Sequence, residues 1–132
     1  MARRRPLSRI AVMQVLFERE RRGEIDPAEA LKRNEEELGE VDGEFAALLL
    51  EGVLDHESEL SEAIQAHAPD WSMDRMDPIS RCVLFIGSFE LLHGKDAPPA
   101  VVMNEAIEIA KEFGTEESGK FVNGVLNAMV KK

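Results

Sequence analysis

Apolar residues recur along this chain at intervals of three and four, which is the spacing of one face of an α-helix. Glycine and proline separate the periodic segments from one another. The first segment carries its apolar stripe at Val12, Met13, Leu16 and Phe17, and it ends before Gly23. Ser8 precedes this stripe, so the pattern predicts a helix with a serine N-cap.

Two further helices are predicted between residues 26 and 54, and a third follows them. Asp26 followed by Pro27 is a typical helix start, and Gly39 ends that helix. After Asp42 a long periodic stretch runs to residue 64, and the polar residues 55–58 are expected to break it in two. Ser58 is the predicted N-cap of the second piece.

The last three predicted helices begin at residues 78, 98 and 115. Asp77 and Pro78 open a segment that is apolar nearly all round, so this helix is expected to be central and enclosed by its neighbours. The next helix ends at Gly114, and Thr115 is the predicted cap of the last one. No segment alternates like a strand, so the sequence predicts an all-α fold of seven helices with short connections.

Length and charge refine this picture. A chain of 132 residues with 44% hydrophobic residues supports one domain, which we expect to span residues 1–132. The net charge is −10, yet residues 1–22 hold seven arginines and two glutamates and are strongly basic. Residues 1–8 are therefore expected to form a flexible basic arm. Such an arm can contact phosphates locally on an acidic protein, because guanidinium groups bind phosphate in a bidentate manner. The alternative is a solubilising tail with no RNA contact.

Motifs for catalysis or metal binding are missing from the sequence. His56 and His67 would align on an unbroken helix, but the predicted break near Ser58 undermines that geometry, and Glu90 with His93 is a single Glu-x-x-His. We therefore predict no catalytic residue, no metal site and no cofactor. His93 is expected to interact with the end of its helix. With one buried cysteine, no leader-like segment and no long apolar run, the sequence predicts a cytoplasmic protein without a membrane segment.

Three sequence blocks, in this order and spacing, resemble the NusB family of transcription antitermination factors. The most specific block is PAVVMNEAIEIAKEFG at residues 99–114, followed by SGKFVNGVL at residues 118–126. The others are RIAVMQVLF at residues 9–17, and WSMDRM at residues 71–76 with RCVLFIGSFELL at residues 81–92. The resemblance covers nearly the whole chain and is weakest over residues 24–42.

The resemblance implies a seven-helix fold of two packed helical bundles and a noncatalytic RNA-binding function. The family binds boxA-type RNA together with the NusE-type small-subunit ribosomal protein, within an antitermination complex on RNA polymerase that supports rRNA transcription. Its RNA surface would correspond here to a set of cationic and aromatic residues, which are Arg3, Arg4, Arg5, Arg9, Phe17, Phe113, Lys120 and Phe121. Arginines would hold phosphates, and exposed rings would stack on unpaired bases.

Other residues and other functions follow less directly from the resemblance. Asn104 and Asn123 are expected to be buried hydrogen-bonding or capping groups, and Trp71 a structural plug. Phe85 stands where the family commonly has arginine, which could alter the partner surface of its helix. The alternative functions are an RNA-binding accessory module of an rRNA methyltransferase, and a homodimeric protein-interaction module. A homodimer of the free chain also stays open.

Overall fold

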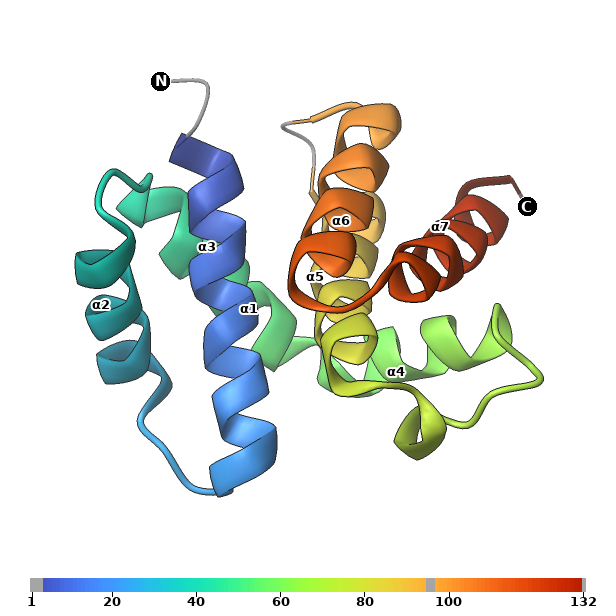
Figure 1. Cartoon of the computed structure of the whole chain (residues 1–132), viewed down its shortest axis with the longest axis horizontal. Helices are drawn as coiled ribbons and strands as arrows, with labels where there is room; N and C mark the ends of the chain where they lie inside the picture. Colours follow the sequence, from blue (N-terminus) through green and yellow to red (C-terminus); the bar gives the residue numbers. More distant parts are fainter. Residues whose placement is uncertain (1–3, 95–96, 132) are drawn as a thin grey trace. The chain divides into compact units, whose positions relative to one another are not determined.

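All regular secondary structure in the described part of the chain is helical, as predicted. The computed structural model describes residues 4–94 and 97–131, and no strand occurs among them. These residues form seven α-helices and one short 3-10 helix, in the order α1 (Arg4–Arg22), α2 (Pro27–Leu38), α3 (Gly43–Asp55), α4 (Glu57–Ala66), η1 (Met73–Arg75), α5 (Pro78–Leu92), α6 (Pro99–Phe113) and α7 (Glu116–Lys131). Figure 1 labels the seven α-helices. The chain divides into two compact units, Met1–Gly52 and Val53–Lys132, and each is described by itself.

In the first unit α1 starts earlier than predicted. Ser8 is not its N-cap but a fully buried residue in its second turn. The Ser8 hydroxyl donates to the Arg4 carbonyl at 2.7 Å and accepts from the Asp42 backbone N–H, also at 2.7 Å. The serine therefore links α1 to the segment that precedes α3, and residues 4–8 of the predicted arm belong to a helix.

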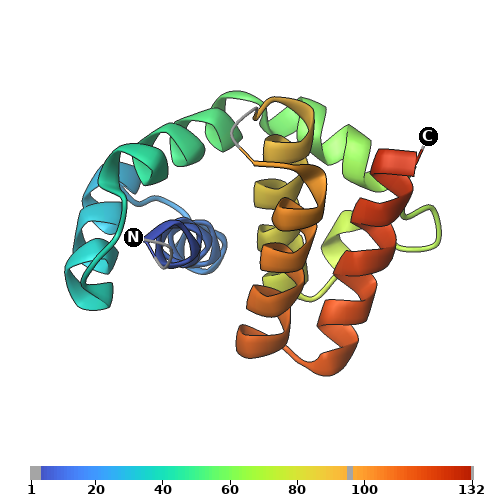
Figure 2. The same cartoon turned by 90° about the horizontal axis from the view of Figure 1, so that it is seen from above.

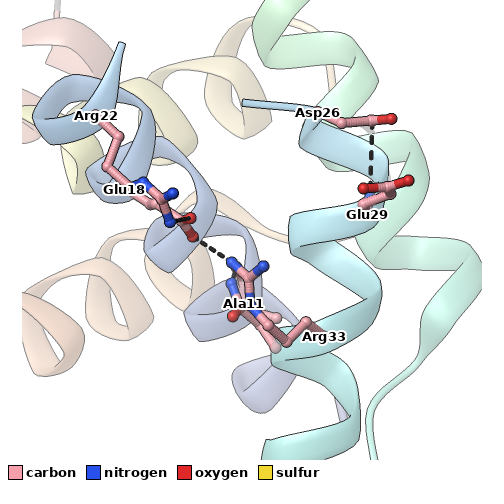
Figure 3. A network of polar contacts seen from close by, with 7 residues as sticks. Ala11, Glu18, Arg22, Asp26, Glu29 and Arg33 are labelled. Atoms are coloured by element: carbon pink, nitrogen blue, oxygen red, sulfur yellow. Dashed lines mark hydrogen bonds and ion pairs between the residues drawn. The ribbon is translucent and has the colours of Figure 1, made fainter. Parts of the chain in front are cut away.

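Helices α1 and α2 of the first unit lie side by side and share a small polar network (Figure 3). Glu18 on α1 accepts hydrogen bonds from Arg22, at 3.1 Å, and from Arg33 on α2. Asp26 caps α2 as predicted, because its carboxylate accepts from the backbone N–H groups of Ala28 and Glu29. Ion pairs on a surface add little stability, so the Arg33–Glu18 contact only supplements the packing of α1 against α2.

The second unit is built around α5, as the all-round apolar pattern predicted. Most of this helix is buried, and α6 and α7 pack against it (Figure 2). Gly87 lets α5 and α7 approach closely, since a Cβ at this position would lie 2.9 Å from Leu126 Cδ1. Asp77 caps α5 by accepting from the Ser80 backbone N–H at 2.8 Å, which confirms the predicted helix start.

The connections confirm the predicted breaks but not every predicted cap. The stretch after Asp42 breaks between α3 and α4, yet His56, not Ser58, occupies the N-cap position of α4. Thr115 caps α7 as predicted, with its hydroxyl accepting from the Ser118 N–H at 3.1 Å while the Ser118 hydroxyl accepts from the Thr115 N–H. The 3-10 helix η1 was not predicted. No helix in residues 4–94 and 97–131 has both the length and the apolar character that crossing a bilayer demands.

Candidate nucleic-acid interface

The N-terminal half of α1 presents arginines around one aromatic ring. Arg4 is exposed, and the Arg5 guanidinium lies 4.5 Å from the centre of the Phe45 ring, with its Nε 3.7 Å from the Asp42 carboxylate. The Arg9 guanidinium lies 5.1 Å from the same ring. Cations over an aromatic face are attracted by its quadrupole, so Phe45 orders this cluster. Sequence reasoning did not single out Phe45, because a phenylalanine at an amphipathic helix start gives no signal of what will lie above it.

One of the predicted arginines differs from the expectation. Arg9 is only 4% exposed, and its guanidinium lies over the Phe45 ring. The direct phosphate contact predicted for Arg9 is therefore not available in this conformation, and the residue is better placed to support Phe45. Arg3 lies outside the described residues.

The predicted aromatic residues are not core residues. Phe17 is half-buried, with the Arg21 guanidinium 5.7 Å from the centre of its ring. Phe113, at the end of α6, is 38% exposed, and Phe121 on α7 is half-buried. Each ring therefore keeps part of its surface available to another molecule.

A pocket in the second unit brings two aromatic rings together. It has a volume of 520 Å³ and combines aromatic, cationic and hydroxyl side chains from the segment before α5 and from the start of α7. The centres of the Trp71 and Phe121 rings are 6.1 Å apart, and their planes meet edge to face at 72°. The lining residues are Trp71, Arg75, Met76, Asp77, Thr115, Glu117, Ser118, Lys120 and Phe121.

Two polar side chains hold the segment that carries Trp71. The amide of Gln65 donates to the carbonyls of Ala68 and Trp71, and its oxygen accepts from the Met73 backbone N–H at 3.0 Å. From the other side, the Arg81 guanidinium donates to the carbonyls of Met73 and Met76, at 2.7 Å each. The backbone of this loop is thus fixed by side chains of α4 and α5, while the indole of Trp71 stays exposed.

The rest of the pocket wall is formed by two helix starts. Asp77 at the start of α5 accepts from the Ser118 hydroxyl at 3.3 Å, which joins α5 to the first turn of α7. Lys120 lies 3.8 Å from Glu117, and both side chains are largely exposed. An ion pair in that setting is weak, so Lys120 can exchange Glu117 for a phosphate at little cost.

The structure changes three interpretations made from the sequence. Trp71 is 48% exposed, so the prediction of a structural plug is wrong. Asn104 and Asn123 are exposed rather than buried, so their predicted role inside the fold is wrong as well. A lone tryptophan in a polar segment, WSMDRM, was the available signal for an exposed ring. Lys120 and Phe121 do share one pocket, whereas Arg4, Arg5 and Phe17 belong to the first unit.

Comparison with known sequences identifies relatives along nearly the whole chain. The profile of the NusB family matches residues 6–131. A Methylacidiphilum infernorum protein is 44% identical over 94 residues, which are 71% of this chain and 66% of that protein. A Kineococcus radiotolerans protein is 40% identical over 126 residues, which are 96% of this chain and 91% of that protein. Both relatives are named transcription antitermination protein NusB.

Solved structures show the same fold. Thermotoga maritima NusB has a TM-score of 0.87 and 37% identity, over 96% of this chain and 90% of that one. A chain of the crystal structure of the antitermination factors NusB and NusE in complex with dsRNA also has a TM-score of 0.87, with 34% identity over 99% of this chain and 98% of that one. The chain therefore belongs to the NusB family.

Proposed function

We propose that this chain is a noncatalytic transcription antitermination factor that binds boxA-type RNA together with a NusE-type ribosomal protein. The observation that carries the proposal is the 520 Å³ pocket, where exposed Trp71 and half-buried Phe121 lie beside Lys120. Family membership and the structural neighbour described as NusB and NusE with dsRNA support the same function. Residues 1–132 would act as a single RNA-binding domain.

Unpaired bases are the RNA groups that the pocket suits. Duplex RNA hides its base faces, whereas single-stranded RNA can stack them on aromatic side chains. The Trp71 and Phe121 rings meet edge to face. In this arrangement a base can stack on the free face of one ring while the second ring contacts the edge of the base. Each such stacking contact contributes about 1–3 kcal/mol.

Cationic side chains around the pocket supply phosphate contacts. Arg75 and Lys120 line it and are both exposed. In the first unit the exposed Arg4 and the partly exposed Arg5 are proposed phosphate ligands, with Arg3 preceding them in sequence. The rest of the chain is acidic, so in each unit these few cations would be the groups that attract phosphates.

The remaining predicted contacts fall into two roles. Phe17 and Phe113 offer exposed ring surface at two separate helices and are proposed to stack on further bases. Arg9 would act indirectly, since its guanidinium supports the Phe45 ring over which Arg5 also lies. A phosphate approaching Arg5 then meets a side chain whose direction is already set, which lowers the entropic cost of binding.

The proposed partners place the chain in the transcription machinery of the cytoplasm. Together with the NusE-type protein it would join an RNA polymerase antitermination complex and support rRNA transcription. Phe85 on α5 is half-buried and apolar where the family commonly carries arginine, so we propose that the partner surface of α5 is more apolar here.

A binding titration with matched variants tests this function. Fluorescent single-stranded boxA-type RNA is titrated with the chain, with and without the NusE-type protein. Trp71→Ala is expected to weaken binding by about 5- to 150-fold, the equivalent of one lost stacking contact. Leu92→Ala is its control, because Leu92 is exposed to a similar extent but lies outside the pocket. Absence of RNA binding under both conditions would reject the proposal.

A further inference from the structure

Two histidines and a glutamate of the second unit converge although they are far apart in sequence. His56 precedes α4, Glu59 belongs to the first turn of α4, and His93 ends α5. One ligand atom from each of these residues lies within 4.8 Å of the others. The His93 Nε2 atom lies 3.0 and 3.1 Å from the two carboxylate oxygens of Glu59. In the sequence, spacing suggests His67 as the partner of His56. Spacing cannot show that the start of α4 lies beside the end of α5.

From this convergence we propose that His56, Glu59 and His93 form a binding site for a divalent transition metal, with Zn²⁺ as the best-matched ion. Two histidines and one glutamate, with a further position left to water, are an established donor set for zinc. Neutral imidazole also suits Cu²⁺ and Ni²⁺, whereas Mg²⁺ and Ca²⁺ prefer oxygen ligands alone.

The geometry permits the three ligands to close on one ion. Atoms bound tetrahedrally at about 2.0–2.2 Å from zinc lie roughly 3.4 Å apart. His93 and Glu59 are already nearer than that, so only His56 must move closer, by a side-chain rotation. A cation entering between the His93 ring and the Glu59 carboxylate replaces their hydrogen bond by two coordination bonds, and the proton of that hydrogen bond is released to water.

Aromatic packing holds the two imidazoles near this arrangement. The centres of the His56 and His93 rings are 4.2 Å apart. Phe89, one turn before His93 on α5, lies 5.4 Å from the His93 ring and 5.7 Å from the His56 ring. These contacts keep the two imidazoles close together, so metal binding requires one side-chain rotation of His56 and no movement of a helix.

Acidic groups and one helix end favour a cation here, whereas the N-terminus of α4, where His56 and Glu59 lie, adds partial positive charge. His93 occupies the C-cap of α5, where the helix dipole places partial negative charge. Asp55 and Glu57 flank His56 in sequence and add acidic groups. Both histidines are half-buried, whereas Glu59 is exposed, which leaves the remaining coordination position open to water. A bound ion would tie the start of α4 to the end of α5.

The test is a calorimetric titration of untagged full-length protein with ZnCl₂, after treatment with a chelator and desalting. The wild type is expected to bind one ion, and Glu59→Gln is expected to weaken the affinity about tenfold or more. Glu59 is exposed, so this change should leave the fold intact, which circular dichroism checks. The matched control is Glu62→Gln, an exposed glutamate on the same helix outside the cluster, which is expected to bind as the wild type does.

A second pair of variants separates this site from any other histidine. His93→Ala is expected to abolish binding, and His67→Ala is expected to retain it, since the His67 Nδ1 atom instead contacts the Ala63 carbonyl at 2.8 Å. The visible spectrum of the Co²⁺-loaded protein should show the strong bands of a low-coordinate site with nitrogen ligands. The proposal would be overturned by unchanged zinc affinity in Glu59→Gln and His93→Ala, or by an equal loss in the His67 control.

Discussion

Packing between α5 and α7 makes a quantitative prediction about two helical glycines. At Gly87 a new Cβ would lie 2.9 Å from Leu126 Cδ1 and 3.7 Å from the Ala106 Cβ. At Gly124, also inside a helix, a new Cβ would meet nothing within 4 Å. Replacing glycine by alanine in a helix gains about 0.8–1 kcal/mol in either place, because alanine restricts the unfolded chain. Only the Gly87 variant also compresses the core.

The expected outcome follows from comparing these two terms. Overpacking a core costs about 1–3 kcal/mol, and Leu126, whose Cδ1 atom the new Cβ would meet, is fully buried. Gly87→Ala is therefore expected to lower the free energy of unfolding by up to about 2 kcal/mol, whereas Gly124→Ala raises it by about 1 kcal/mol. For a chain of this size, each kcal/mol shifts Tm by roughly 3–5 °C.

Urea denaturation of the two variants measures this difference directly. The combination of Gly87→Ala with Leu126→Ala checks its cause, because removing the leucine methyl groups should cancel the overpacking cost. The change in the free energy of unfolding of the double variant should then differ from the sum of the two single changes by about 1–3 kcal/mol. The close packing inferred for α5 and α7 would be refuted if Gly87→Ala stabilised the fold as much as Gly124→Ala does. It would also be refuted if the effects of Gly87→Ala and Leu126→Ala were strictly additive in the double variant.

Three further predictions concern the first unit and the pocket. Ser8→Ala should lower the free energy of unfolding, measured by urea denaturation, by about 0.5–1.5 kcal/mol, because it removes the acceptor of the part-buried Asp42 backbone N–H, whereas the exposed Ser58→Ala should be nearly neutral. Burial raises the pKa of Glu35, so its charged form destabilises the fold at neutral pH and this penalty disappears as pH falls below the ordinary carboxyl range. In thermal denaturation the Tm of Glu35→Gln should accordingly exceed that of the wild type near neutral pH and equal it in acid. Equal Tm values of the two proteins at neutral pH would contradict a burial penalty on the Glu35 carboxylate. Gln65→Ala should release the loop of Trp71, seen as altered tryptophan fluorescence and weaker RNA binding, and unchanged values would argue against that support.

Local signals in the sequence predicted most of the fold. Asp26 and Asp77 cap their helices as expected, since a short acidic side chain before a proline at the first helical position has one favourable arrangement. The all-round apolar pattern of residues 79–92 likewise predicted a buried central helix. Ser8 shows the limit of this reasoning, because its partner Asp42 is remote in sequence and a buried tertiary contact overrode its capping preference.

The candidate site was less accessible to sequence reasoning. Lys120 and Phe121 came from the family resemblance, and the structure adds Trp71 and Arg75 from a segment that periodicity could not describe. Arg9 has the residue type of a phosphate ligand, yet its side chain is buried and its guanidinium lies over the Phe45 ring. Residue type and spacing identify candidates, whereas exposure depends on contacts between segments that are distant in sequence.

Trp71 is proposed to stack on a base and Lys120 to bind a phosphate, and the salt dependence of RNA affinity separates these two roles. Affinity for single-stranded boxA-type RNA is measured over a series of salt concentrations for the wild type, Trp71→Ala, Lys120→Ala and Lys131→Ala, an exposed lysine near the other end of α7. Trp71→Ala should lower affinity without changing the slope of log affinity against log salt. Lys120→Ala should make that slope shallower by about 0.7, the value for one phosphate on a single strand, and Lys131→Ala should not. These roles would be contradicted if Trp71→Ala bound the RNA as tightly as the wild type does. They would also be contradicted if Lys120→Ala and Lys131→Ala had the same salt slope.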